Sequence, residues 1–294
     1  MLPSRYRAEW LTEGVRELLT EVARDAGGTG DPAIVYHRRE VLVLRVGKIV
    51  VKSHHTGSSS LAERLAVAAA HPDLLLAPLS GVRELRGRLV TAWPAGEPVD
   101  PGDPEDAPWE EAARLLAALH ARPLPDGLPR QGAPARVHEV LSRPLPEDHP
   151  ATAVVRRAYA SLPPVLEEGD GGHLVHGDFH LGQLVRHEGA WRLIDVDDLG
   201  RGDPVWDLAR PAALFCAGVL PESVWSRFLG AYLEHGGVDL GPDPWRRLDI
   251  PARALAIQTA ARCVSHAVDG KRPLDPYETA LIDTCDRIGS LASR

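Results

Sequence analysis

The spacing of apolar residues changes character once along this 294-residue chain, near Trp93, and this change limits the possible folds most strongly. Before that point, the short β-branched runs AIVYH, VLVLRV and KIVVKS predict strands, with Gly47 at a hairpin turn. After the Pro- and Gly-rich segment PAGEPVDPGDPEDAP, helical spacing dominates. We therefore expect a small antiparallel sheet followed by a larger, mainly helical part.

Helical periodicity also places individual elements along the chain. One helix is expected over 6–26, and another begins near Ser60, where Ser60 and Glu63 have the spacing of a capping box. The Pro-rich stretch 123–150 is expected to be an extended surface segment. The later helices are expected at 109–120, 151–168, 204–216, 223–235, 245–268 and 276–291.

Composition excludes several classes of partner. The formal net charge is −8, and no basic stripe is present, so nucleic acid is not expected as a partner. No apolar stretch of about 18 residues could span a bilayer, and no secretion signal opens the chain, so no membrane partner is expected. The three cysteines lie far apart without a CxxC pair, which indicates core side chains in a reducing compartment and a cytoplasmic protein.

The segment LVHGDFHLGQLV, from Leu174 to Val185, encloses polar, turn-forming residues between two short apolar runs. HEGA then turns the chain between QLVR and WRLID, so Gln183 and Asp195 are expected near opposite ends of a hairpin, facing one cleft. Phosphoryl transfer needs a carboxylate that orients or deprotonates a hydroxyl, and oxygen ligands for Mg²⁺. Asp178 can supply the carboxylate, and Gln183 and Asp195 can supply the ligands.

A lysine on the N-terminal sheet would complete such a site by binding phosphate oxygens. Lys52 ends the strand VVK and is one of only three lysines among 33 basic side chains. Glu63, one turn into the next helix, either pairs with Lys52 or acts only in the capping box. Two simpler interpretations stay open: Lys52 as a solvated strand-end lysine and Asp178 as an ordinary turn aspartate.

The remaining polar residues near these motifs have less specific interpretations. The spacing of His176 and His180 lacks the HExxH pattern of a metal site, so both are expected to support the loop through hydrogen bonds. The pair His54 and His55 is expected in solvent. The pair Asp197 and Asp198 is expected to form a solvated turn; alternatively, Asp197 assists the metal or attracts a cationic substrate.

Together the motifs resemble the aminoglycoside phosphotransferase family of the protein-kinase-like superfamily. Its signature is HGDxHxxN, a hairpin, IDW or a variant, and GDPxxDLA; this chain has HGDFHLGQ, LIDVDD and GDPVWDLA within 176–209. LLAALHARP is similar to the family's LHxxP helix, and VTAWPAGEPV to its hinge. The resemblance implies an α+β, bilobal protein-kinase-like fold, with a small antiparallel-sheet nucleotide-binding lobe at 1–93, a hinge at 94–98 and a helical catalytic and substrate lobe at 99–294.

The resemblance also implies a role for each site residue. Asp178 would be the catalytic base, Gln183 and Asp195 the Mg²⁺ ligands, and Asp207 a brace for the catalytic loop. The nucleotide-binding residues would be Lys52, Glu63 and Trp93.

Two features depart from the family pattern. Gln183 stands where most members have Asn, and the form HLGQ resembles the variant of maltokinases; the longer amide still offers a carbonyl oxygen to Mg²⁺. The turn HRRE between the first two strands has no glycine, whereas glycine lets backbone amides approach phosphates closely.

We therefore expect a Mg²⁺-dependent kinase that transfers the γ-phosphate of ATP or GTP to a hydroxyl of a small molecule, such as an aminoglycoside, a sugar or a related natural product. Two alternatives stay open: a kinase-fold binding or scaffold protein with weak catalysis, and a kinase that acts on a peptide in a biosynthetic pathway. Residues 239–294 carry eight acidic and eight basic side chains, so no acidic excess selects a polycation. A neutral or amino sugar fits at least as well as an aminoglycoside.

Overall fold

A computed structural model describes residues 4–38, 41–54, 60–100, 102, 105–166 and 172–291. Its contacts divide the chain into two compact units. Unit 1 comprises Met1–Pro98 and Leu184–Asp197, and unit 2 comprises Val99–Gln183 and Asp198–Arg294. The hairpin region 184–197, which the sequence division assigned to the C-terminal lobe, therefore groups with the N-terminal sheet.

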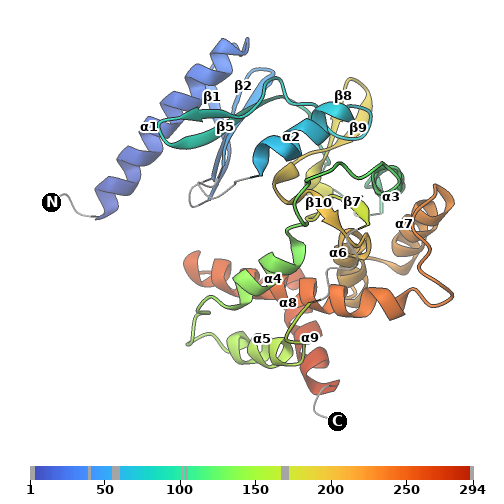
Figure 1. The fold of residues 1–294 in the computed structure, drawn as a ribbon. Helices are drawn as coiled ribbons and strands as arrows, with labels where there is room; N and C mark the ends of the chain where they lie inside the picture. The colour runs from blue at the N-terminus through green and yellow to red at the C-terminus, as the bar shows by residue number, and fades with distance from the viewer. Residues whose placement is uncertain are drawn as a thin grey trace. The chain divides into compact units, whose positions relative to one another are not determined.

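Unit 1 is built on an antiparallel sheet with the strand order β1-β2-β3-β5-β4. Helix α1 (Ser4–Asp25) lies beside this sheet (Figure 1). Gly47 turns the chain between β2 and β3 with φ 58°, a left-handed conformation that favours glycine, so the expected hairpin is present. Arg39 and Glu40 of the HRRE turn lie outside the described residues. The strands are β1 (Pro32–Arg38), β2 (Val41–Val46), β3 (Ile49–Ser53), β4 (Arg83–Leu85) and β5 (Arg88–Pro94).

Alternate residues of these strands form one apolar core with helix α1. Leu42 and Leu44 of β2 and Val51 of β3 point to the same face, because side chains alternate along a strand. Leu19 and Val22 of α1 pack against them. The second helix of unit 1, α2 (Leu61–Ala70), begins after Ser60, whose side chain makes no capping hydrogen bond, so the capping-box prediction is wrong.

A second, smaller sheet explains why the hairpin belongs to unit 1. Its order is β6 (Glu97–Pro98), β8 (Leu184–His187) and β9 (Ala190–Leu193). β6 pairs with β8, and Leu193 forms a further bridge with Leu75, so backbone hydrogen bonds connect the hairpin to the N-terminal part of the chain. Sequence spacing carries no signal for such pairings.

Unit 2 is mainly helical, as predicted. Helix α8 contacts α4, α5, α6 and α9, and α3 contacts α7. Strand β7 (His173–Val175) pairs antiparallel with β10 (Gly200–Gly202). The helices are α3 (Trp109–His120), α4 (Ala133–Leu141), α5 (Ala151–Ala160), α6 (Val205–Cys216), α7 (Glu222–Glu234), α8 (Trp245–Asp269) and α9 (Pro276–Leu291).

Helix α4 contradicts the prediction that 123–150 is extended. Its proline is Pro134, at the start of the helix, where a missing backbone N–H costs nothing. Val137 and Leu141, four residues apart, are buried and give the short helix an apolar face. Proline content alone therefore concealed a helix that carries a residue of the candidate site, Arg136.

Two further expectations from composition concern the burial of the cysteines and the absence of a membrane-spanning segment. Cys263 and Cys285 are buried as predicted, whereas Cys216, at the C-terminal end of α6, is exposed. Within the described residues, no helix combines the length and the apolar character that a membrane crossing requires.

Candidate active site

The first polar cluster lies in unit 1 around Lys52 of β3. Its ammonium nitrogen Nζ is 2.7 Å from Asp195 Oδ1 and 2.9 Å from Asp197 Oδ2. Burial alone would lower the pKa of Lys52, but the two carboxylates outweigh it and raise the pKa above its usual range. Burial would likewise raise the pKa of Asp197, and Lys52 instead lowers it. Lys52 and Asp197 are therefore both ionised at neutral pH.

Asp195 has an uncommon backbone conformation. Its φ is 62°, in the left-handed region that residues with a Cβ seldom adopt. Its Oδ1 lies 3.4 Å from the backbone nitrogen of Asp197, which donates to it. Such conformations cost of order 1–3 kcal/mol and cluster at functional sites, where neighbouring contacts hold them in place.

His54 follows β3 and belongs to the same cluster, so the prediction that it is solvated is wrong. Its side chain is 1% exposed, because the backbone nitrogen of His54 donates to Leu89 O and prolongs the strand pairing. The ring nitrogen Nε2 is 2.7 Å from Thr91 Oγ1. Nδ1 lies 3.0 Å from Asp197 Oδ1, without hydrogen-bond geometry. His55 lies outside the described residues.

The other two predicted nucleotide-binding residues, Glu63 and Trp93, make no hydrogen bond or ion pair with Lys52. Glu63 is exposed and makes no ion pair among the described residues, because Lys52 is paired with Asp195 and Asp197 instead. Trp93, at the end of β5, is buried and donates from Nε1 to Thr91 Oγ1 at 2.9 Å. A nucleotide contact at Trp93 stays a prediction.

The second cluster lies in unit 2, where the loop after β7 is held by Asp207 of α6. Asp207 is fully buried, and its two oxygens accept hydrogen bonds from the backbone nitrogens of His176 and Gly177, each at 2.7 Å. Gly177 has φ 80°, and a Cβ there would lie 2.2 Å from the backbone oxygen of Asp198. This position therefore admits only glycine.

Two residues that were not predicted complete this support. His120 Nε2, at the end of α3, is 2.9 Å from Asp207 Oδ2, and its Nδ1 is 2.8 Å from the Tyr232 hydroxyl. Burial is the main reason that the pKa of Tyr232 is raised. The LLAALHARP motif contained a signal for His120, since it resembles a helix of the family, whereas Tyr232 of α7 had none.

The two loop histidines also bond to the backbone. His176 is buried, and its Nδ1 accepts a hydrogen bond from the backbone nitrogen of Asp178 at 3.4 Å. His180 Nδ1 accepts one from the backbone nitrogen of Gly182 at 3.0 Å. Both contacts constrain the turn that presents Asp178.

Asp178 itself is bound by two arginines that sequence reasoning missed. Arg210 Nη2 of α6 lies 2.8 Å from Asp178 Oδ1, and Arg136 Nη1 of α4 contacts Oδ2. Burial alone would raise the pKa of Asp178, but Arg136 and Arg210 outweigh it and hold the pKa far below its usual range. Arg136 also binds Asp198. Because Asp197 and Asp198 each pair with a cation, the prediction of a solvated turn is wrong.

Gln183 ends a short 3₁₀ turn, Leu181–Gln183. Its backbone nitrogen donates to His180 O at 2.8 Å, and the residue is 8% exposed. The amide of its side chain makes no hydrogen bond to the part of the chain that the structure describes. Within that part, no group of three or more His, Cys, Asp or Glu side chains is placed to hold a metal.

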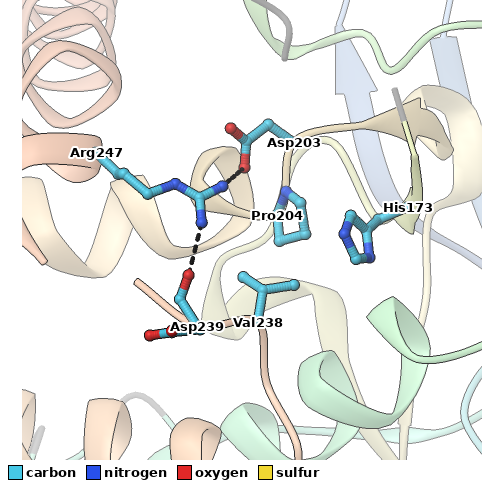
Figure 2. A pocket seen from close by; sticks show the side chains of 6 residues that line it. All are labelled: His173, Asp203, Pro204, Val238, Asp239 and Arg247. Carbon is cyan, nitrogen blue, oxygen red and sulfur yellow. Dashed lines mark hydrogen bonds and ion pairs between the residues drawn. The ribbon is translucent and has the colours of Figure 1, made fainter. Parts of the chain in front are cut away.

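A separate cavity of about 600 Å³ lies in unit 2, and Figure 2 shows its lining. Arg247 reaches Asp203 Oδ1 and the backbone oxygen of Asp239, each at 2.8 Å. His173 lies on the other side of Pro204 and Val238 in this view, and its Nδ1 is 3.1 Å from the backbone oxygen of His120. These polar groups bond to one another or to the backbone, and none is a predicted site residue.

A family model described as the phosphotransferase enzyme family (APH) matches residues 27–249. The chain belongs to this family. The predicted family is thus confirmed, and membership supports a phosphotransferase activity. The kinase-like APH fold is confirmed as well, with an antiparallel sheet in the N-terminal region and a mainly helical C-terminal part.

Solved structures of similar fold include several small-molecule kinases. A choline/ethanolamine kinase family protein from Mesorhizobium loti has 20% identity and a TM-score of 0.58, covering 96% of this chain and 95% of that one. Amicoumacin kinase in complex with AMP-PNP, Ca²⁺ and Ami has 17% identity and a TM-score of 0.63, covering 92% and 93%. An aminoglycoside phosphotransferase from Streptomyces rimosus has 21% identity and a TM-score of 0.58, covering 83% and 98%. No curated protein matches the sequence.

Proposed function

We propose that this APH-family protein is a kinase that transfers the γ-phosphate of ATP or GTP to a hydroxyl of a small molecule. The observation that carries the proposal is the Lys52–Asp195 ion pair in unit 1. A strand lysine that binds nucleotide phosphates and a carboxylate that binds the metal are both needed for phosphoryl transfer. The contact with Asp195 raises the pKa of Lys52, so the ammonium group stays charged for the phosphates.

Magnesium fits the side chains available. Mg²⁺ prefers oxygen ligands and is usually held by one or two carboxylates together with substrate phosphates and water, so a cluster of three acidic residues is not required. Asp195 would supply a carboxylate, and the Gln183 amide, which makes no hydrogen bond to the described residues, would supply a neutral oxygen. We propose these two residues as the ligands. When bound, the ion would offset negative charge on the phosphates.

Asp178 would accept the acceptor's proton. The acceptor oxygen forms a bond to the γ-phosphorus, the bond from this phosphorus to the bridging oxygen breaks, and the hydroxyl proton passes to Asp178 as the nucleoside diphosphate leaves. The carboxylate is ionised at neutral pH because Arg136 and Arg210 lower its pKa. An ionised carboxylate can orient the hydroxyl and accept its proton.

The related structures support a nucleotide, a divalent cation and a small acceptor. The amicoumacin kinase was solved with AMP-PNP and Ca²⁺. The related structures include a choline/ethanolamine kinase family protein, an amicoumacin kinase and an aminoglycoside phosphotransferase, so the fold does not fix the acceptor.

A kinase-fold binding protein with weak catalysis is the second candidate. Two observations favour it: Gln183 replaces the usual Asn, and both oxygens of Asp178 are bound by arginines. A peptide acceptor is a further alternative that only an acceptor screen can test.

The test is a phosphate-transfer assay on the purified chain with Mg²⁺ and ATP or GTP against aminoglycosides, sugars and peptides. Asp178→Ala should lose turnover by about 10²- to 10⁴-fold, since that is the usual contribution of a general base, while nucleotide binding persists. Unchanged turnover in Asp178→Ala would reject the mechanism. Nucleotide binding without transfer to any acceptor would favour the binding-protein alternative.

A further inference from the structure

Two arginines bind the carboxylate that the proposed reaction needs as its base. Arg210 of α6 donates from Nη2 to Asp178 Oδ1 at 2.8 Å, and Arg136 of α4 binds Oδ2. All three side chains belong to unit 2 and are between 14% and 18% exposed. Each oxygen of Asp178 thus has a guanidinium partner, while a ligand can still reach the cluster from solvent.

This arrangement opposes the role of a general base. A base has to offer an oxygen to the acceptor hydroxyl within hydrogen-bond reach, and its proton affinity has to suit the working pH. The two guanidinium groups compete for the oxygens of Asp178 and keep its pKa low. Removing either one from Asp178 would free an oxygen and make the carboxylate more basic.

The guanidinium groups are suited to an anionic ligand. Arginine presents its N–H donors in a planar fork that matches a carboxylate or a phosphate. Arg210 Nη1 donates to Thr259 Oγ1 at 3.2 Å, but Nε is buried and has no hydrogen-bond partner among the described residues. An unpaired buried donor is unfavourable, and a ligand oxygen would satisfy it. Arg262 of α8 and His180 add positive potential near Asp178.

A cationic acceptor would find no matching group in this cluster. Both carboxylates, Asp178 and Asp198, are bound by Arg136, so an ammonium group would first have to displace a guanidinium. A neutral acceptor would displace neither arginine. An anion can replace Asp178 as the partner of a guanidinium group, so the arginine that leaves Asp178 stays paired.

We infer that the acceptor carries an anionic group, a carboxylate or a phosphate ester, close to the hydroxyl that is phosphorylated, and that Arg136 and Arg210 bind this group. Binding draws at least one guanidinium away from Asp178, so recognition of the acceptor and release of the base occur together. The inference rests on the proposed phosphotransferase function and specifies its acceptor class.

Calorimetric titration of the full chain without nucleotide tests the inference. The probes are D-glucuronate, D-glucose, D-glucosamine and inorganic phosphate; each of the two charged sugars differs from glucose at one carbon. We expect glucuronate or phosphate to bind about tenfold or more tightly than glucose or glucosamine, and the comparison of the two anions distinguishes a carboxylate from a phosphate acceptor. Arg136→Gln and Arg210→Gln should weaken anion binding about tenfold or more.

Arg143→Gln is the matched control, because it removes the same charge from an arginine just beyond α4 that is more exposed than Arg136, and it should leave anion binding unchanged. Arg210→Lys keeps the charge and should retain part of the affinity for the anion. It provides a second test if Arg210→Gln fails to fold. The inference is overturned if neither anion binds saturably, if glucosamine binds as well as the tighter of the two anions, or if the site variants bind like Arg143→Gln. Failure of the proposed function looks different: anions bind, yet no phosphate passes from ATP or GTP to any acceptor.

Discussion

Lys52 Nζ lies 2.7 Å from Asp195 Oδ1, although 143 residues separate the two in sequence. Asp197 forms a second ion pair with the same lysine. Strand alternation places Lys52 on the face of β3 opposite the core. Both carboxylates come from the segment that directly follows the hairpin β8–β9, which also belongs to unit 1. The lysine is therefore held by residues that follow the catalytic motif, and not by Glu63 of α2.

Lys52→Met is expected to weaken binding of Mg²⁺–ATP about 10- to 100-fold, because charge-assisted hydrogen bonds to phosphate contribute about 1.5–3 kcal/mol. Isothermal titration with a non-hydrolysable ATP analogue measures the effect. Lys48→Met is the matched control, since Lys48 is an exposed lysine of the same β2–β3 hairpin. Equal affinities in the two variants would remove Lys52 from the nucleotide site.

Gly177→Ala is expected to destabilise the protein and to remove activity, because the new Cβ would meet the backbone oxygen of Asp198 at 2.2 Å. Gly189→Ala separates this clash from backbone strain: Gly189 has the same φ of 80°, but nothing lies within 4 Å of its added Cβ. The control should lose only about 1–2 kcal/mol of unfolding free energy, the usual cost of a left-handed alanine. Denaturant unfolding of both variants measures the difference, and equal losses would contradict the steric argument.

Asp207→Asn should lower the free energy of unfolding by about 1–3 kcal/mol, the cost of leaving a buried donor without an acceptor. The carboxylate accepts from two backbone nitrogens and contacts His120, whereas an amide has only one acceptor oxygen. Asp249→Asn makes the same change at a half-exposed position of α8 and is the control. Thermal or urea unfolding followed by circular dichroism measures the loss. A stability equal to that of the control would contradict the role of Asp207 in holding the loop.

The pH dependence of kcat/KM should report on the arginines around Asp178. The charged groups that face this carboxylate are Arg136 of α4, Arg210 of α6, Arg262 of α8 and His180 of its own loop. They depress its pKa in the folded protein, so Asp178 stays ionised as the pH falls through about 4, the ordinary aspartate value. Protonation of Asp178 should therefore cause no fall in kcat/KM above about pH 4. Any stability gained from this ionisation is present above the unfolded pKa and is lost as the pH falls further.

Arg210→Gln removes one of these cations and should let Asp178 protonate at higher pH. The acid limb is expected to move upward by about one pH unit or more. A purely structural role for Arg210 would lower kcat without moving the limb. Arg143→Gln, far less buried, should leave the profile unchanged.

The sequence predicted the local elements well because their causes are local. Periods of two and of about 3.6 residues placed β2, β3 and the helices α6 to α9, and Gly47 placed the first hairpin. The stretch 123–150 was the main failure: its prolines suggested an extended segment, yet Pro134 sits where a helix tolerates proline. That error also hid Arg136, because a residue on an unrecognised helix gives no hint of what it faces.

Burial and pairing were harder to predict than secondary structure. His54 was expected in solvent, because two adjacent histidines after a strand do not form an apolar pattern. One more backbone hydrogen bond, from His54 to Leu89, extends the strand pairing and places the His54 ring in the interior. Asp197 and Asp198 looked like a solvated pair, and each instead meets a cation from a distant segment.

The sequence by itself determined the family, the kinase-like fold and the identity of the motif residues Asp178, Gln183, Asp195 and Asp207, because these depend on short patterns in a fixed order. Only the tertiary structure decided their partners: the two carboxylates that hold Lys52, and the two arginines that hold Asp178. The physical reason is that a charge far from solvent requires an opposite charge nearby in space. Which residue supplies it depends on how helices and strands pack, and neither composition nor spacing along the chain records that.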